Sequence, residues 1–236
     1  MRLDKFLCEM KAGSRSQVRV LLRQGLVTVN GTVVTQADQK IDENQDSICL
    51  QGRLLQYQKF LYFMLHKPGE VVSATCDNRD KTVLELLRME DRREDLFPVG
   101  RLDKDTEGLL LLTNDGELAH RLLSPKRHVD KTYLVTLKRE PSEEELLCLE
   151  RGVDIGEEQP TMPARVCRQG TQQILLTIHE GKFHQVKRMA QAVDNQVTAL
   201  KRVSFGGLSL DESLHPGEYR PLSEEEVRQL RNVCEK

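Results

Sequence analysis

Residues 100–116 read GRLDKDTEGLLLLTNDG, a short acidic loop followed directly by four leucines. Asp103, Asp105 and Glu107 stand at every second position, and Gly108 separates them from the leucines. A continuous apolar run of this length, bounded by glycine and by the turn residues NDG, is typical of a strand buried on both faces. The segment therefore predicts a buried strand with a carboxylate loop at its N-terminal end.

Three carboxylates in one loop could bind calcium, shape a turn or carry a reaction. An EF-hand loop starting at Asp103 would have suitable residues at its first, third, fifth and sixth positions. The twelfth position, however, needs a glutamate and is Asn114, and leucines fill the seventh to tenth positions. The pattern excludes a calcium loop. We expect Asp105 and Glu107 to shape or solvate the turn, and Asp103 to lie at the edge of the core.

The composition is that of a soluble globular protein. Of the 236 residues, 38% are hydrophobic and 31% are charged. No apolar run approaches the roughly 20 residues that span a bilayer. The charged start, MRLDKFLCEM, is unlike a signal peptide, so we expect a cytoplasmic protein with no membrane contact. The six cysteines form no C-x-x-C pair and signal neither a zinc site nor a redox motif.

The net charge of −2 conceals two basic zones. Residues 1–24 hold six basic groups against two acidic ones, and residues 121–139 hold six against one. Acidic residues are concentrated in 140–160 and beyond 211. Because localised positive charge is what a nucleic-acid backbone selects, the distribution indicates such a partner although the average does not.

Periodicity divides the chain into a small and a large part. Apolar spacing and a capping box starting at Ser14 predict two helices within residues 3–24, and Asn30-Gly31 predicts a hairpin. Residues 52–60 have the character of a linker. Further on, strands are predicted at 60–65, 109–113, 131–137, 172–178 and 198–210, and helices at 82–87, 117–124, 142–151, 183–193 and 223–233. This mixed order favours an α+β fold with a largely antiparallel sheet.

The N-terminal part resembles the alpha-L RNA-binding module of a ribosomal small-subunit protein. RLDKFL, SRSQVRVLLRQGLVTVNG and Lys40 carry the resemblance, which covers residues 1–58. Three arginines, spaced by four residues, form one stripe along the second predicted helix. The resemblance implies that five basic residues contact RNA phosphates: Arg2, Lys5, Arg15, Arg19 and Arg23.

The remainder, residues 59–236, resembles the pseudouridine synthases of the RsuA/RluA type. GRLDKDTEGLLLLTNDG matches their signature loop, and FMLHKPGEVVS, KTYLV, EGKFHQVKRM and ALKRVSFGGLSL follow the family order around it. HQVKRM is similar to the small-subunit rRNA branch, known as the RsuA type. The large-subunit branch tends to have Asn-Arg where this chain has Phe183-His184.

The resemblance implies isomerisation of a uridine to pseudouridine in 16S rRNA. This rearrangement needs no metal and no cofactor, because nothing is oxidised or hydrolysed. Asp103 is implied as the catalytic carboxylate, and whether it attacks the sugar, attacks the base or abstracts a proton stays open. A cation must offset its desolvation, and Lys187 has this role in the family pattern, with Arg188 as the alternative. Tyr133 corresponds to the tyrosine that stacks on the target base.

The target uridine would be flipped out of the RNA stack into a pocket. Leu200 would wall that pocket, and Arg101, Lys67 and Arg202 would support the flanking RNA. His184 and Gln185 could contact RNA or hold the helix in place. The predicted substrate-binding set is therefore Arg101, Lys67, Leu200, Arg188, Arg202 and Gln185. The expected partner is 16S rRNA or a small-subunit assembly intermediate, bound by a monomer.

Two other classes of protein are alternatives to this enzyme. A catalytically silent RNA-binding or ribosome-assembly protein could keep the same fold. It has no reason to retain Asp103, Tyr133 and Lys187 together, so the three favour an enzyme. A phosphate- or metal-dependent hydrolase is excluded by the lack of a P-loop, an HExxH motif or clustered metal ligands.

Overall fold

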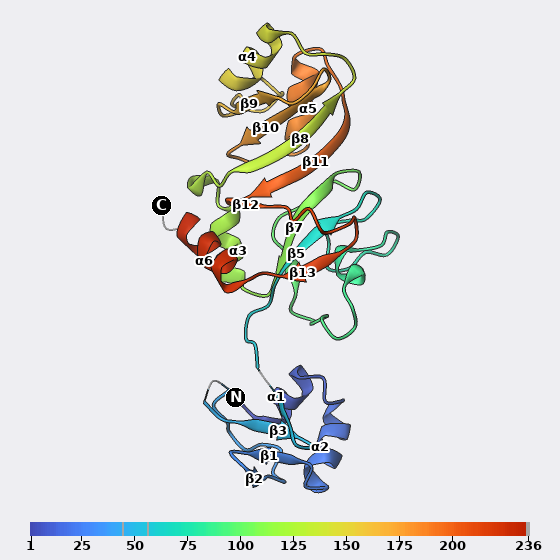
Figure 1. The fold of residues 1–236 in the computed structure, drawn as a ribbon, viewed down its shortest axis with the longest axis vertical. Helices are drawn as coiled ribbons and strands as arrows, with labels where there is room; N and C mark the ends of the chain where they lie inside the picture. Colours follow the sequence, from blue (N-terminus) through green and yellow to red (C-terminus); the bar gives the residue numbers. More distant parts are fainter. Residues whose placement is uncertain (44, 56, 235–236) are drawn as a thin grey trace. The chain divides into compact units, whose positions relative to one another are not determined.

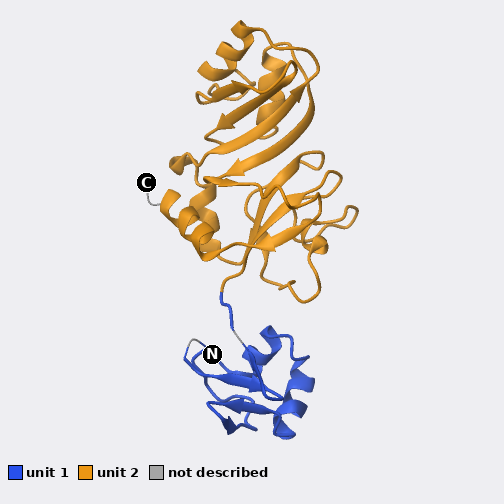
Figure 2. Cartoon of the chain, viewed as in Figure 1, with its two compact units in different colours: residues 1–59 blue, residues 60–236 orange. Residues whose placement is uncertain are grey.

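The computed structural model describes residues 1–43, 45–55 and 57–234. The chain divides into two compact units, Met1–Lys59 and Phe60–Lys236, coloured separately in Figure 2. Within the described residues, no helix combines the length and the apolar character that crossing a bilayer requires.

The first unit packs two helices on a four-stranded antiparallel sheet. Its elements are α1 (Leu3–Glu9), α2 (Arg15–Arg23), β1 (Val27–Val29), β2 (Thr32–Val33), β3 (Ile48–Leu50) and β4 (Arg53–Leu55), with strand order β2-β1-β3-β4. The capping box at the start of α2 is confirmed, because Ser14 accepts from the Gln17 backbone and the Gln17 side chain reaches back. Phe6, Val18 and Ile48 are buried where the two layers meet.

Two tight turns set the register of this small sheet. Asn30 and Gly31 have φ values of 51° and 80°, as a type I′ hairpin requires, and they join Val29 to Thr32 as predicted. The predicted linker at 52–60 was wrong in part. A second turn at Gln51-Gly52 folds residues 53–55 back onto β3, so they form β4, and position 56 lies outside the described residues.

The second unit is built on a nine-stranded sheet. Its strands are β5 (Tyr62–Lys67), β6 (Phe97–Pro98), β7 (Glu107–Thr113), β8 (Lys131–Leu137), β9 (Arg165–Arg168), β10 (Gln173–Ile178), β11 (Val197–Phe205), β12 (Leu208–Ser209) and β13 (Tyr219–Pro221). Along the sheet the order is β13-β5-β7-β11-β8-β10-β9, with β6 on β7 and β12 on β11. Among these strands only β7 and β11 pair in parallel, which confirms the predicted α+β class.

Helices cover both faces of this sheet. They are α3 (Gly116–Leu123), α4 (Glu143–Arg151), α5 (Gln185–Ala192) and α6 (Glu224–Val233), with 3-10 turns η1 (Val83–Leu86) and η2 (Pro125–Arg127). Figure 1 shows α3 and α6 side by side next to β12. The predicted helix at 82–87 is thus a single 3-10 turn, and the short strands β6, β9 and β13 were not predicted.

The four leucines lie in the strand that separates two cores. Leu110 and Leu112 pack into one core with α4 and α5, whereas Leu109 and Leu111 pack into the other with α3 and α6. All four are at most 3% exposed, so the strand is apolar on both faces as predicted.

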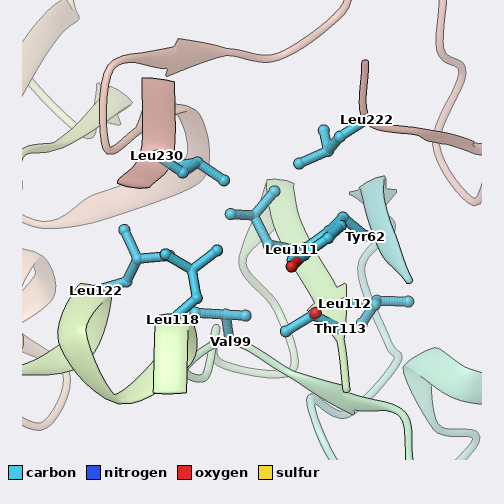
Figure 3. A pocket seen from close by; sticks show the side chains of 9 residues that line it. All are labelled: Tyr62, Val99, Leu111, Leu112, Thr113, Leu118, Leu122, Leu222 and Leu230. Carbon is cyan, nitrogen blue, oxygen red and sulfur yellow. The ribbon is translucent and has the colours of Figure 1, made fainter. Parts of the chain in front are cut away.

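The second core contains a small pocket between β7, α3 and α6 (Figure 3). Leucines form most of its wall, and its two polar side chains already have partners. The Tyr62 hydroxyl donates to Asp115 at 2.7 Å, and the Thr113 hydroxyl donates to the Leu61 carbonyl at 2.7 Å. The pocket is therefore a packing gap of the core and offers little to a polar ligand.

Candidate active site

Asp103 lies in the loop that leads into β7, with its side chain 30% exposed. The Thr106 backbone N–H donates to the Asp103 carbonyl at 3.0 Å and closes a tight turn. Gly108, at φ 105°, then brings β7 against β11, where a Cβ atom would lie only 2.2 Å from the Arg202 carbonyl oxygen. Any side chain at position 108 would separate the two strands, so this glycine fixes where the loop begins.

Two side chains from the preceding segment hold the loop in place. Ser73 accepts a hydrogen bond from the Leu102 N–H at 3.0 Å and donates one to the Leu102 carbonyl at 2.9 Å, so it clamps the residue before Asp103. Sequence reasoning missed Ser73, although it ends the FMLHKPGEVVS motif.

Lys67 is the second anchor, and its burial corrects the prediction that it supports RNA. Its side chain is fully buried, and its ammonium donates to the carbonyls of Pro68 at 2.9 Å, Lys104 at 3.1 Å and Thr106 at 2.8 Å. Burial lowers the pKa of Lys67 to about 8, although the nearby carboxylates, Asp105 first, act in the opposite direction. Lys67 therefore ties the loop to the end of β5 from inside and has no surface left for RNA.

The carboxylates of the loop share one cation, which comes from α5. Lys187 Nζ lies 2.8 Å from Asp103 Oδ2 and 2.6 Å from Asp105 Oδ1. Burial alone would lower the pKa of Lys187, but its hydrogen bonds to the two aspartates outweigh this effect and raise it. The hydrogen bond from Lys187 lowers the pKa of Asp105 against the opposing effect of burial. Asp105 thus does more than shape the turn, since it is a second partner of the same ammonium.

Lys187, and not Arg188, is the cation that pairs with Asp103, because the two residues face different sides of α5. Arg188 points to another segment, where it pairs with Glu157 at 2.6 Å and donates to the carbonyls of Phe183 and Ile155. Neighbouring helical residues are about 100° apart, so only one of them can face Asp103. The predicted substrate-binding role of Arg188 is not supported, because its guanidinium is occupied within the protein.

Tyr133 and Leu200 lie on adjacent strands at the level of the loop. Tyr133 on β8 is paired with Arg202 on β11, which in turn is paired with Gly108 at the start of β7. Tyr133 and Leu200 are each 8% exposed and belong to the same buried cluster as Leu102, the neighbour of Asp103. Both residues therefore lie on the strands beside the start of β7, and their roles at the target base stay a prediction.

Two further predicted RNA contacts are buried in the protein interior. Gln185 is 4% exposed, donates to Glu180 at 2.9 Å and accepts from the Lys182 N–H at 2.9 Å. Gln185 therefore holds the start of α5 and does not contact RNA. Arg202 is 2% exposed, donates to the Leu109 carbonyl at 2.8 Å and covers the Phe205 ring. Arg202 thus stabilises the junction of β7 and β11. Of the three cations predicted to support the RNA beside the uridine, Arg101, Lys67 and Arg202, only Arg101 is exposed.

His184 is the second basic residue at Asp103. Its Nε2 lies 3.5 Å from Asp103 Oδ1, and its backbone takes the left-handed conformation, φ 49°, directly before α5. This conformation explains why the helix begins at Gln185 rather than at the predicted position 183.

The basic stripe of the first unit is exposed along α2. Arg15, Arg19 and Arg23 are all exposed and take part in none of the ion pairs found among the described residues. Arg2 instead pairs with Asp4 at 2.8 Å, and Lys5 lies 3.6 Å from Glu9. Of the five basic residues predicted to contact RNA, the three on α2 are therefore the best suited to contact phosphates.

The described geometry suits a reaction at a carboxylate. Asp103 is partly shielded from water, is paired with a lysine ammonium, and directly follows Leu102 of the buried core. A carboxylate in such a setting can act as a nucleophile or a base.

Comparison with known proteins assigns both units. The family model described as RNA pseudouridylate synthase matches residues 61–192, more than half of the chain, and the S4 domain model matches residues 1–47. A solved structure described as a pseudouridylate synthase is 40% identical, with a TM-score of 0.70, and the match covers 98% of this chain and 99% of the other.

The curated relatives match over almost their whole length. The RNA pseudouridine synthase YtzG of Bacillus subtilis is 49% identical, with 98% of both chains covered. The ribosomal small subunit pseudouridine synthase A of Vibrio cholerae is 43% identical, covering 98% of this chain and 99% of the relative. The ribosomal large subunit pseudouridine synthase B of Bacillus subtilis is 40% identical, covering 99% and 97%.

Proposed function

The chain belongs to the RNA pseudouridine synthases of the RsuA type, and we propose that it isomerises one uridine of 16S ribosomal RNA with Asp103 as the catalytic carboxylate. The observation that carries this proposal is the 2.8 Å contact of Lys187 Nζ with Asp103 Oδ2. It joins two motifs 84 positions apart and supplies the compensating charge that a partly buried catalytic carboxylate needs.

The reaction breaks the bond between uracil N1 and the ribose C1′, turns the base, and forms a bond from C5 to C1′. The proton on C5 is lost and one is gained at N1, so no second substrate is consumed. Asp103 would form a bond to the ribose or the base, or remove a proton, while the hydrogen bond from Lys187 holds its carboxylate in place. Tyr133 would stack on the base, and Leu200 would limit its movement while it is detached.

The target uridine would enter the site by flipping out of the RNA stack, because the reacting atoms of a stacked base cannot reach the active site. Arg101, which is exposed just before Asp103, would contact the neighbouring backbone. The arginine stripe on α2 would bind phosphates, and this contact selects RNA shape rather than sequence. We expect the protein to act as a monomer in the cytoplasm, on rRNA or on an assembly intermediate of the small subunit.

Small-subunit rRNA is favoured by Phe183-His184 in the EGKFHQVKRM motif, because the large-subunit branch tends to have Asn-Arg there. A large-subunit target is the second candidate, since a relative named for that subunit is 40% identical to this chain. The two identities of 43% and 40% are too similar to separate the candidates.

Release of tritium from C5-labelled uridine separates them directly. Transcripts of both rRNAs and assembly intermediates of both subunits would be incubated with the protein, and pseudouridines would be mapped in rRNA from cells that lack it. We expect release from 16S rRNA or its assembly intermediate, and one missing pseudouridine in that RNA. Release from the large-subunit rRNA alone would contradict the proposal.

A further inference from the structure

Phe183 presents its ring to solvent next to the candidate active site. It is 73% exposed, as is Met89, and no other large hydrophobic residue in the described part of the chain is more exposed. A single exposed apolar side chain is ordinary in itself. Its surroundings distinguish Phe183, because it directly precedes His184 and the helix that carries Lys187.

The ring is stacked on that of His184 and is thereby placed near the reactive carboxylate. The ring centroids are 3.8 Å apart and the planes differ by 20°. His184 Nε2 is in turn 3.5 Å from Asp103 Oδ1. One face of Phe183 is thus covered by the imidazole, and the ring is separated from Asp103 by a single side chain.

The backbone that carries this pair is held on both sides. Gln185 accepts from the Lys182 N–H at 2.9 Å, and Arg188 donates to the Phe183 carbonyl at 3.0 Å. Lys182 Nζ donates to the Gln159 carbonyl at 2.7 Å. His184 keeps a left-handed conformation that is unfavourable for residues other than glycine. The exposed ring therefore stands on a fixed support.

We propose that the stacked pair of Phe183 and His184 is a platform for the base of a nucleotide that flanks the target uridine. The inference rests on the proposed function in one respect, namely that the uridine reacts at Asp103. When a uridine is flipped out, each flanking base loses a stacking partner and exposes an aromatic face. A solvent-facing ring beside the reaction centre replaces that partner, and such stacking accepts any of the four bases.

Three variants test the ring. Phe183→Leu keeps an apolar side chain but removes the π face, Phe183→Trp keeps a π face, and Met89→Leu changes an equally exposed residue elsewhere. We expect Phe183→Leu to weaken RNA binding roughly five- to a hundredfold. Phe183→Trp should bind within a few-fold of wild type, and Met89→Leu should not differ. Thermal unfolding of all three should match wild type, because the ring is not part of a core.

The direct readout is base stacking. The substrate is a fragment of whichever ribosomal RNA the wild-type protein modifies, with 2-aminopurine at one flanking position at a time, mixed with excess protein in a single turnover. We expect one position whose fluorescence is quenched by wild type and Phe183→Trp but not by Phe183→Leu. If Phe183→Leu quenches the fluorescence and binds RNA as wild type does, the inference is overturned. The same holds if Phe183→Leu loses only binding to a ribosomal protein and keeps its affinity for RNA. A large-subunit target would contradict the proposed function but leave this test valid.

Discussion

Lys187 Nζ donates a hydrogen bond to Asp103 Oδ2 across 84 positions of sequence, and a second one to Asp105 Oδ1. One ammonium thus joins α5 to the loop before β7 and neutralises part of the charge of two adjacent carboxylates. The side chain of Lys187 is 23% exposed, so this pairing is less screened than one on the open surface. The lysine therefore fixes the position of the loop, and its hydrogen bond lowers the pKa of Asp105.

Replacing Lys187 with methionine should lower kcat by about 100-fold or more. It leaves two aspartates side by side without their cation, and losing a charged hydrogen bond costs about 1.5–3 kcal/mol at each carboxylate. Arg188→Met is the matched control, because it removes a cation from the next position, where the partner is Glu157. Single-turnover isomerisation of bound RNA measures the effect. Equal losses in the two variants would contradict the assignment of Lys187.

Lys67 should be required for the shape of the catalytic loop. Lys67→Met removes the donor of three backbone carbonyls, and we expect about 1–3 kcal/mol of lost stability and a lower kcat at pH 7. Lys104→Met, at an exposed surface pair with Asp80, should cost less than about 1 kcal/mol. Urea denaturation of both variants provides the comparison. Similar losses of unfolding free energy in the two variants would contradict the role of Lys67 as the anchor of the loop.

The lowered pKa of Lys67 also predicts a pH dependence with a defined sign. Between about 8, its pKa in the folded chain, and the ordinary value of 10.5, the unfolded chain binds a proton that the folded chain has released. Stability therefore increases with pH across this window. The free energy of unfolding of wild type, measured relative to Lys67→Met, should be constant below pH 8 and rise between pH 8 and 10.5. A difference in unfolding free energy that does not change with pH would show that the pKa of Lys67 is not lowered.

Charge reversal on α2 should weaken RNA binding and its salt dependence together. In the double variant Arg15→Glu, Arg19→Glu, the slope of log affinity against log salt should fall by about 1 for each arginine that contacts a phosphate. Arg53→Glu, at an exposed site on β4, is the control. Filter binding at several salt concentrations gives the slopes. An unchanged slope in the double variant would contradict phosphate contact by this helix.

Much of the fold could be predicted because its strongest signals are local. The capping box at Ser14, the Asn30-Gly31 turn and the four leucines each determine structure through near neighbours. The missed strands depend on distant partners instead. β9, with the sequence RVCR, alternates exposed and partly exposed residues and exists because it pairs with β10. β13 ends at Pro221 and lies at the edge of the sheet, where it pairs with β5.

The site shows the same division between local and distant information. Asp103, Tyr133 and Lys187 could be predicted because each lies in a motif of a recognised family, and the structure confirms only that Lys187 pairs with Asp103. The errors at Lys67, Gln185 and Arg202 share one cause. A charged or polar residue in such a motif is expected to face the ligand, whereas these three satisfy backbone or side-chain groups of segments that fold over them. For Lys67, the covering loop lies 37 to 39 positions further along the chain.

The most direct test of the account compares two aspartates that bind the same ammonium. Asp103→Asn and Asp105→Asn each remove one charge beside Lys187 and keep the size of the side chain. Release of tritium from C5-labelled uridine should fall on the order of 10⁴-fold or more for Asp103→Asn, with RNA binding retained. Asp105→Asn should lose less than about tenfold, which corresponds to one weakened charged hydrogen bond. Activity that persists in Asp103→Asn, or an equal loss in both variants, would contradict the role of Asp103 as the catalytic carboxylate.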